Sequence, residues 1–172
     1  AGLFKHKEWV KAAYATGVPM GADLLKPASK APSFVVWATK DPDSANLDRM
    51  QIVKGWSING QSFERIYDVA WAGTRKPDSA TGKVPPVGST VDLTKGTYTN
   101  SIGAVELKTV WTDPDFDPAL DAFYYVRVLE IPTPRWSTMQ ALKLGRVPPS
   151  GTGFSAIIQE RAWSSPIWYT PS

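Results

Sequence analysis

The sequence contains no cysteine and only one histidine, His6, among its 172 residues. A chain without thiols can form neither disulfides nor thiolate nucleophiles nor zinc–cysteine sites. A single histidine would need partners from distant sequence to act in catalysis, and the chain has no Gly-x-Ser-x-Gly motif that would present a serine nucleophile. We therefore expect no catalytic residue in this chain. The absence of cysteine fits a periplasmic and a cytosolic protein equally well.

Long apolar runs and dense charge are also scarce. No apolar segment approaches the length needed to cross a membrane, so we expect no membrane span. The net charge of +3 is spread along the chain, apart from Lys5, His6, Lys7 and Lys11 near its start. Nucleic-acid binding usually requires a denser basic patch, so we expect no nucleic-acid partner. The chain begins without Met and without a signal-peptide pattern, and we expect it to be a piece of a longer protein.

The composition, with 42% hydrophobic and 20% charged residues, is that of a globular protein. Fifteen prolines and 13 glycines are spread along the chain, which is typical of short strands joined by ordered loops. Residues 6–16 predict a short helix that Gly17 would end in a left-handed conformation. We therefore divide the chain into an N-terminal helix with an extended linker loop, residues 1–32, and a single β domain, residues 33–172.

Segments typical of β-strands dominate the rest of the chain. They comprise residues 34–39, 49–58, 63–71, 102–111, 123–131, 156–160 and 162–169. The segment 34–39 is apolar on both faces, which predicts burial on both sides, whereas Pro166 marks the last segment as an edge or bulged strand. Asn59-Gly60 separates two segments and predicts a hairpin. Without alternating helices, the pattern predicts a mainly β protein: an antiparallel β-sandwich, Ig-like in general architecture, with long Pro/Gly-rich loops.

The sequence is rich in tryptophan, with eight residues. Trp37, Trp56, Trp71 and Trp111 fall in predicted strands, mostly on the faces expected to form the core. Aromatic side chains bury large apolar areas, so we expect most of the tryptophans to pack in the core. A carbohydrate-binding module would instead display two or three aromatic rings in a flat exposed row.

Three carboxylates at alternate positions, Asp113, Asp115 and Asp117, resemble the start of a calcium-binding loop. The remainder of that template fails, because Pro118 stands where the loop needs glycine and Tyr124 where it needs glutamate. These residues are therefore weak metal candidates, and a solvated loop with Asp-based turns is the simpler interpretation.

Two charged residues, Arg127 and Glu130, interrupt an apolar segment that we expect to be the central strand. They fall on opposite faces of that strand, and burial would require partners for them. Arg161 occupies a similar position before the last strand-like segment. The sequence favours buried or half-buried ion pairs that set strand register, with substrate contacts as the functional alternative.

The same strand runs into a corner, in the sequence YYVRVLEIPTPRWST. Pro132 and Pro134 cannot donate ladder hydrogen bonds, so the strand must end or leave the sheet there. The corner places Arg135 and Trp136 at the end of the sheet, which makes them candidate substrate contacts.

Several long segments together resemble one bacterial family. They are GVPMGADL (17–24), ANLDRMQIVKGW (45–56), YDVAWAG (67–73), VWTDPDFDP (110–118), AFYYVRVLEIPTPRWST (122–138) and QERAWSSPIWYTP (159–171). Through nearly all of its length, the chain is similar to the C-terminal portion of domain-of-unknown-function family 3604. Motifs as long as EIPTPRWST are far more specific than a short glycine pattern.

Members of that family are longer, and their N-terminal part looks like a PHP-type (polymerase and histidinol phosphatase) metal-dependent phosphoesterase barrel. The resemblance implies that this chain is the C-terminal β-rich accessory part of a PHP-like hydrolase, with the barrel as its partner. It implies no cofactor in this chain and a divalent metal in the barrel, since this chain lacks the His-x-His pattern that begins a PHP site. It also implies a periplasmic or otherwise exported protein, although a cytoplasmic location stays open.

Next to such a barrel, the corner would be rigid, and Arg135 would reach an anionic substrate with Trp136 packed behind it. Two other functions stay open. One is an independent carbohydrate- or protein-binding β-sandwich module. The other is a structural domain, which would carry a broad apolar patch for its partner. The sequence decides neither the substrate and metal of the longer protein nor the oligomeric state.

Overall fold

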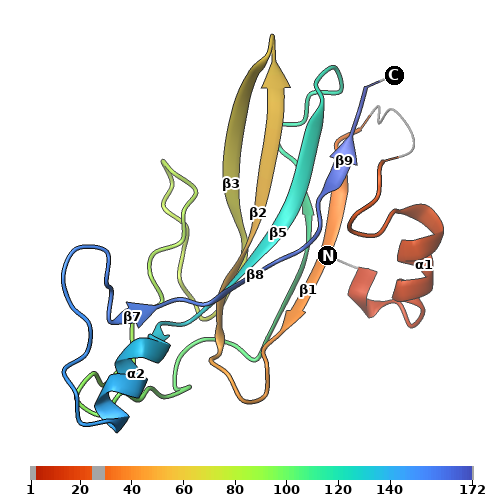
Figure 1. Cartoon of the computed structure of the whole chain (residues 1–172). Helices are drawn as coiled ribbons and strands as arrows, with labels where there is room; N and C mark the ends of the chain where they lie inside the picture. The colour runs from red at the N-terminus through yellow and green to blue at the C-terminus, as the bar shows by residue number, and fades with distance from the viewer. Residues whose placement is uncertain (1–2, 25–29, 172) are drawn as a thin grey trace.

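Antiparallel strands account for most of the regular structure in the computed structural model, which describes residues 3–24 and 30–171 (Figure 1). In chain order the elements are the 3-10 helix η1 (Leu3–Lys5), α1 (Trp9–Thr16), β1 (Ser33–Thr39), β2 (Leu47–Ile58), β3 (Gln61–Trp71), β4 (Glu106–Thr112), β5 (Ala122–Glu130), β6 (Thr133–Pro134), α2 (Trp136–Lys143), β7 (Ile157–Ile158), β8 (Arg161–Trp163) and β9 (Ile167–Tyr169). The predicted mainly β, antiparallel class is confirmed.

The strands form one large sheet and two small ones. The large sheet has the order β3-β2-β5-β8, with β9 also pairing with β5, and a separate two-stranded sheet joins β1 to β4. The third sheet joins the short strands β6 and β7 beside α2, at one end of the large sheet (Figure 1). The predicted hairpin joins β2 to β3. Asn59 and Gly60 both have positive φ (51° and 77°), as a two-residue hairpin turn requires.

The core lies between the five-stranded sheet and the β1–β4 pair, which gives the two layers of a β-sandwich. Its buried residues come from both layers and are Phe34, Val36, Leu47, Met50, Ile52, Leu107, Ala122, Tyr124 and Tyr169. The second layer has only two strands, so it covers only part of the larger sheet. This inequality decides which surfaces of the protein stay open.

Strand β1 is buried on one face only, which corrects the predicted burial on both sides. Phe34 and Val36 are buried, whereas Val35 and Trp37 are exposed. The β1–β4 pair is the outer layer of the sandwich, and no further sheet packs on its outer face in the described part of the chain. Two aromatic rings of the N-terminal segment lie against Trp37 on that face, with ring centroids 5.5 Å away for Trp9 and 6.5 Å away for Phe4.

Four further details differ from the sequence predictions. Helix α1 starts only at Trp9, and Gly17 ends it with φ of −129°, an extended conformation in which its N–H bonds to the Ala13 carbonyl at 2.9 Å. The strand predicted to start at residue 102 begins at Glu106, because positive φ at Gly103 bends the chain before it. None of the eight tryptophans, all of which lie in the described residues, is fully buried, and two of them, Trp56 and Trp111, pack partly buried against the core. Smaller side chains and Tyr124 fill the core instead.

A close contact between two neighbouring strands shapes the outer face of the large sheet. Gly55 of β2 pairs with Phe123 of β5, and the phenyl ring lies directly over the glycine. A methyl group at position 55 would come within 2.3 Å of the ring carbon Cζ of Phe123. The absence of a side chain at Gly55 is therefore a packing requirement.

The change Gly55→Ala is expected to lower the free energy of unfolding by about 1–3 kcal/mol, since an overpacked site must shift its backbone or leave its preferred rotamers. Urea unfolding followed by tryptophan fluorescence measures the change. Phe123→Leu should reduce the cost of the alanine, because the ring that causes the clash is gone, and Ser62→Ala in the exposed hairpin serves as control. A cost that is the same in both backgrounds would contradict the contact.

Candidate functional site

A buried polar network lies at the start of β2, on the outer face of the large sheet. Arg49 forms ion pairs with Asp48 (Nε–Oδ2 3.0 Å) and with Asp68 of β3 (Nη1–Oδ2 3.1 Å). Its guanidinium also donates to the carbonyls of Val84 and Pro85, at 2.6 and 2.8 Å. The arginine therefore ties the loop after β3 to the central strand of the sheet.

A second arginine, Arg75, completes this network from the same loop. Its Nη2 lies 2.7 Å from Asp48 Oδ1, at an angle that makes an ion pair without a hydrogen bond. The same side chain donates to the carbonyls of Asp48, Ala72 and Pro85. Two carboxylates and two guanidiniums thus balance each other, as buried charges require. Because their donors are directed at protein carbonyls, these arginines anchor a loop and are not arranged to bind an anion.

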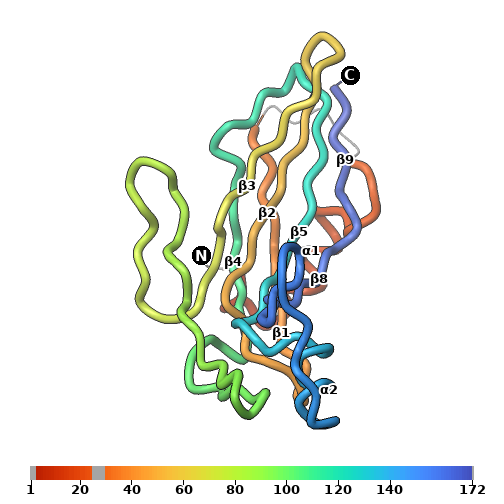
Figure 2. The backbone as a smooth tube through the Cα atoms, turned by 60° about the vertical axis from the view of Figure 1, so that its left-hand side comes forward, coloured from red at the N-terminus to blue at the C-terminus, as the bar shows by residue number. Residues whose placement is uncertain are grey.

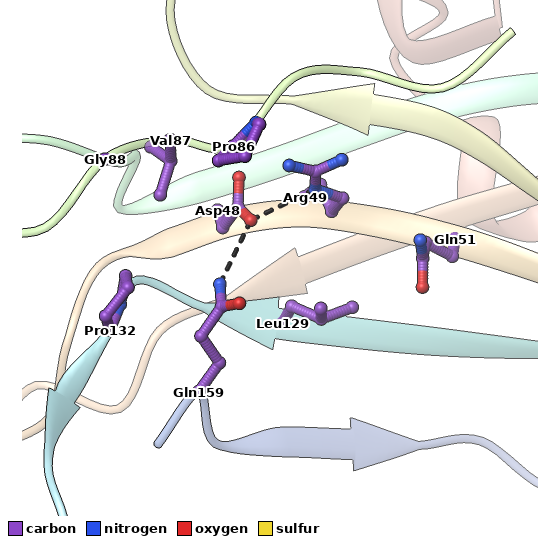
Figure 3. A pocket seen from close by; sticks show the side chains of 9 residues that line it. All are labelled: Asp48, Arg49, Gln51, Pro86, Val87, Gly88, Leu129, Pro132 and Gln159. Atoms are coloured by element: carbon purple, nitrogen blue, oxygen red, sulfur yellow. Dashed lines mark hydrogen bonds and ion pairs between the residues drawn. The ribbon is translucent and has the colours of Figure 1, made fainter. Parts of the chain in front are cut away.

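A small hollow of about 190 Å³ lies beside the network (Figure 3). Its lining consists of Asp48, Arg49, Gln51, Pro86, Val87, Gly88, Leu129, Pro132 and Gln159. Figure 3 shows Gln159 reaching across from the segment before β8 to donate to Asp48 Oδ2, at 3.2 Å. The hollow is the place where β2, β5, the loop after β3 and the segment before β8 meet.

The predicted residue Arg127 belongs to the edge of the same network. Its Nε donates to Gln51 Oε1 at 2.8 Å, and Gln51 in turn donates to Asp68 Oδ1 at 2.6 Å. Glu130 accepts the hydroxyl of Ser44, whose Oγ lies 2.9 Å from both carboxylate oxygens. The prediction that Arg127 and Glu130 form ion pairs is therefore wrong among the described residues. Neutral side chains, Gln51 and Ser44, are their hydrogen-bond partners instead. Arg161 is exposed on β8.

The proline corner has the predicted backbone and a different environment for its side chains. Strand β5 ends at Glu130, and the chain pairs again only as β6, with β7. The backbone N–H of Arg135 donates to the Ala156 carbonyl and its Nε to the Ser155 carbonyl, both at 2.9 Å. Trp136 is 68% exposed, so its ring does not pack behind Arg135 within this chain, and the contact expected next to a barrel stays a prediction. The two bonds of Arg135 tie the corner to the segment before β7.

The three aspartates of the DPDFDP motif have separate partners. Asp113 is buried and accepts from Lys54 Nζ at 2.6 Å and from the Tyr124 hydroxyl at 2.8 Å. Asp115 pairs with Arg65 at 2.8 Å, and Asp117 caps a turn by accepting the Ala119 N–H. Among residues 3–24 and 30–171, no group of three or more His, Asp or Glu side chains is placed to hold a metal ion. Burial, together with the hydrogen bond to Asp113, raises the pKa of Tyr124 and keeps its hydroxyl protonated.

A much larger opening lies on the opposite side of β5, between β1, α1 and the strands β8 and β9. It is an open groove of about 1430 Å³, and among the described residues that line it none carries a charge. Phe34 and Val36 of β1 form one wall, and Val126 and Val128 of β5 form its floor. This groove marks the part of the large sheet that the two-stranded layer leaves uncovered.

Aromatic rings gather on the outer face of the large sheet, at the end away from the polar network. Phe123 and Tyr125 of β5 are nearly parallel, with ring planes 8° apart and centroids 6.3 Å apart. Trp168 of β9, which is 47% exposed, lies 5.2 Å from Phe123. A flat aromatic row was expected only if the chain were a carbohydrate-binding module. The sequence analysis otherwise expected most of the tryptophans in the core.

Glu130 gives the site a testable pH dependence. Burial raises the pKa of its carboxyl above the ordinary value of 4.5, and the Ser44 hydroxyl offsets only part of that effect. The folded state therefore binds the proton more tightly than the unfolded state, and this stabilisation is lost as the pH rises through the raised pKa. Replacing Glu130 with Gln removes the titration.

The difference in the free energy of unfolding, Glu130→Gln minus wild type, is therefore expected to be larger at pH 7 than at pH 4. Urea unfolding of both proteins at the two pH values measures this difference. Glu64→Gln, at an exposed position on β3, is the control for removing a carboxylate. A difference between Glu130→Gln and wild type that does not change with pH would contradict the burial of this carboxyl.

Comparisons with known proteins identify one family. No curated protein and no solved structure matches the chain. Among the described helices, none has the length and apolar character needed to span a membrane. The model of one family, described as "Protein of unknown function (DUF3604)", matches residues 1–171. Because the match covers almost the whole sequence, the chain belongs to the DUF3604 family.

Proposed function

We propose that this chain is the accessory β-sandwich domain of a longer, PHP-like metal-dependent hydrolase, and that it docks on the catalytic barrel of the same polypeptide without supplying catalytic residues. The observation that carries this proposal is the groove of about 1430 Å³ between β1, α1 and β5, in which the described lining residues carry no charge. Large apolar openings in monomeric domains mark surfaces that a partner covers.

The chemistry of the polar residues supports the accessory role. The strongest cluster, around Arg49 and Asp48, directs its donors at backbone carbonyls and holds a loop in place. Two acids of the DPDFDP motif, Asp113 and Asp115, are paired with Lys54 and Arg65. These charged groups are engaged within the fold, so they stabilise the domain and leave the chemistry to another part of the protein.

A binding experiment with separately expressed parts tests the docking. The rest of the longer polypeptide, expressed without this 172-residue domain, is expected to bind this chain in isothermal titration calorimetry. Ala162→Glu, which places a charge in the lining of the groove beside Val128, should weaken binding at least tenfold because a buried carboxylate needs a partner. Trp136→Glu, on α2, should leave the affinity unchanged.

The opposite pattern, with binding lost in Trp136→Glu and kept in Ala162→Glu, would place the contact at the proline corner and overturn docking through the groove. Activity gives a second test, with generic phosphoesters and added Mn²⁺ or Zn²⁺. Turnover is expected only when the remainder of the protein is present. Metal-dependent turnover by this chain alone would overturn the non-catalytic role.

A second candidate function, saccharide binding, is favoured by the parallel rings of Phe123 and Tyr125 with Trp168 beside them. Sugar rings stack on exposed aromatic faces through their apolar C–H surfaces, and side chains such as Arg127 would supply hydrogen bonds along the same strand. Such a site would lie on the outer face of the large sheet and would not involve the groove.

Cello-oligosaccharides and xylo-oligosaccharides are the probes for this candidate. If they bind, they shift the NMR signals of the Phe123 and Tyr125 rings, and Trp168→Ala weakens binding at least tenfold through the loss of ring stacking. Trp136→Ala, a matched change on α2, should have no effect on the affinity. Unchanged ring signals with both kinds of oligosaccharide would exclude these sugars as ligands of the aromatic rings.

A further inference from the structure

Strand β1 has an unprotected edge. It pairs with β4 along one side, and no strand pairs with its other side among residues 3–24 and 30–171. Its sequence, SFVVWAT, contains no charge and no proline, and Val35 on it is 39% exposed. Such an edge presents a row of unpaired backbone groups, which is a template for a further strand.

The edge of the large sheet at β3 is built differently. Strand β3 carries the charged residues Glu64, Arg65 and Asp68, and its pairing with β2 is interrupted by an irregularity at Met50 and Gln51. The ammonium group of Lys83 also bonds to a backbone carbonyl of β3 from the loop that stands beside that strand (Figure 2). Charges, bulges and covering loops are the devices that keep edges from pairing. The chain therefore protects one edge and leaves the edge of β1 open.

The open edge lies directly beside the apolar groove. Phe34 and Val36 of β1 line it together with Val126 and Val128, which belong to the part of the large sheet without a second layer. A strand added next to β1 would extend the two-stranded sheet and place every second side chain over these valines. Backbone pairing and apolar burial would then be satisfied by one element.

We propose that the free edge of β1 accepts an extended strand from another part of the same polypeptide, whose uncharged apolar side chains fill the groove. This proposal rests on the proposed docking function and names the element that docks. Helix α1 stands beside the same edge and contributes Trp9 and Ala13 to the lining of the groove (Figure 1). A single extended strand needs only the edge itself, whereas a second copy of the domain would bring its own α1 against the first.

Hydrogen–deuterium exchange of the chain alone and of the full-length protein tests the strand addition. In an antiparallel pair, alternate amides of β1 point away from β4 and are free to bond to an added strand. These amides are expected to exchange at least tenfold more slowly in the full-length protein. Val35→Lys in the full-length protein should restore fast exchange, because a charge on the edge opposes pairing. Val105→Lys, at an exposed position before β4, is the matched control and should not.

Three results would overturn the proposal. Fast exchange at β1 together with shifted methyl signals of Val126 and Val128 would show docking without strand addition. Fast exchange at β1 with unshifted methyl signals of Val126 and Val128 would contradict both the strand addition and the docking function. Protection that disappears on dilution, with a dimer in size-exclusion chromatography, would identify a second copy as the occupant.

Discussion

Burial of β2 on both faces is the constraint on which the rest of the structure depends. Residues 47–55 of this strand are all buried, because β3 and β5 pair with its two edges while the core and the polar network cover its two faces. Asp48, Arg49, Gln51 and Lys54 lie within this stretch, and buried polar groups without partners would cost several kcal/mol each. Each of them therefore selects a partner from a distant part of the chain.

Those partners organise the surrounding loops. Lys54 draws Asp113 and the DPDFDP segment onto the inner face of the sheet, where Tyr124 binds the same carboxylate. Arg49 holds the loop after β3 through two carbonyls on the outer face. The acidic motif that resembled a metal site is thus a counterion for a buried lysine. The charged residues explain the order of the loops, and the uncovered apolar surface explains where the protein can still bind something.

The sequence predicted the architecture well and the environment of single residues less well. Asn59-Gly60 identified the hairpin, and the prolines after Glu130 identified the end of β5, since both depend on local backbone chemistry. Burial depends on which layer a strand joins. The apolar strand β1 became an outer strand with one solvent-exposed face, whereas β2, with four buried polar residues, became the most buried of the long strands. A pattern of apolar residues cannot distinguish these cases, because paired charges remove the penalty that would keep them at the surface.

What the sequence determined by itself is the mainly β class, the turns and the family, because turn residues, strand periodicity and long motifs are local properties of the chain. Only the tertiary structure decided that Arg127 meets Gln51, that Glu130 meets Ser44, and that Trp136 stays exposed. It also decided that two strands cover a sheet of five, which leaves the groove and the edge of β1 open. These features depend on which distant segments pack together, and that choice is made by the whole set of buried contacts.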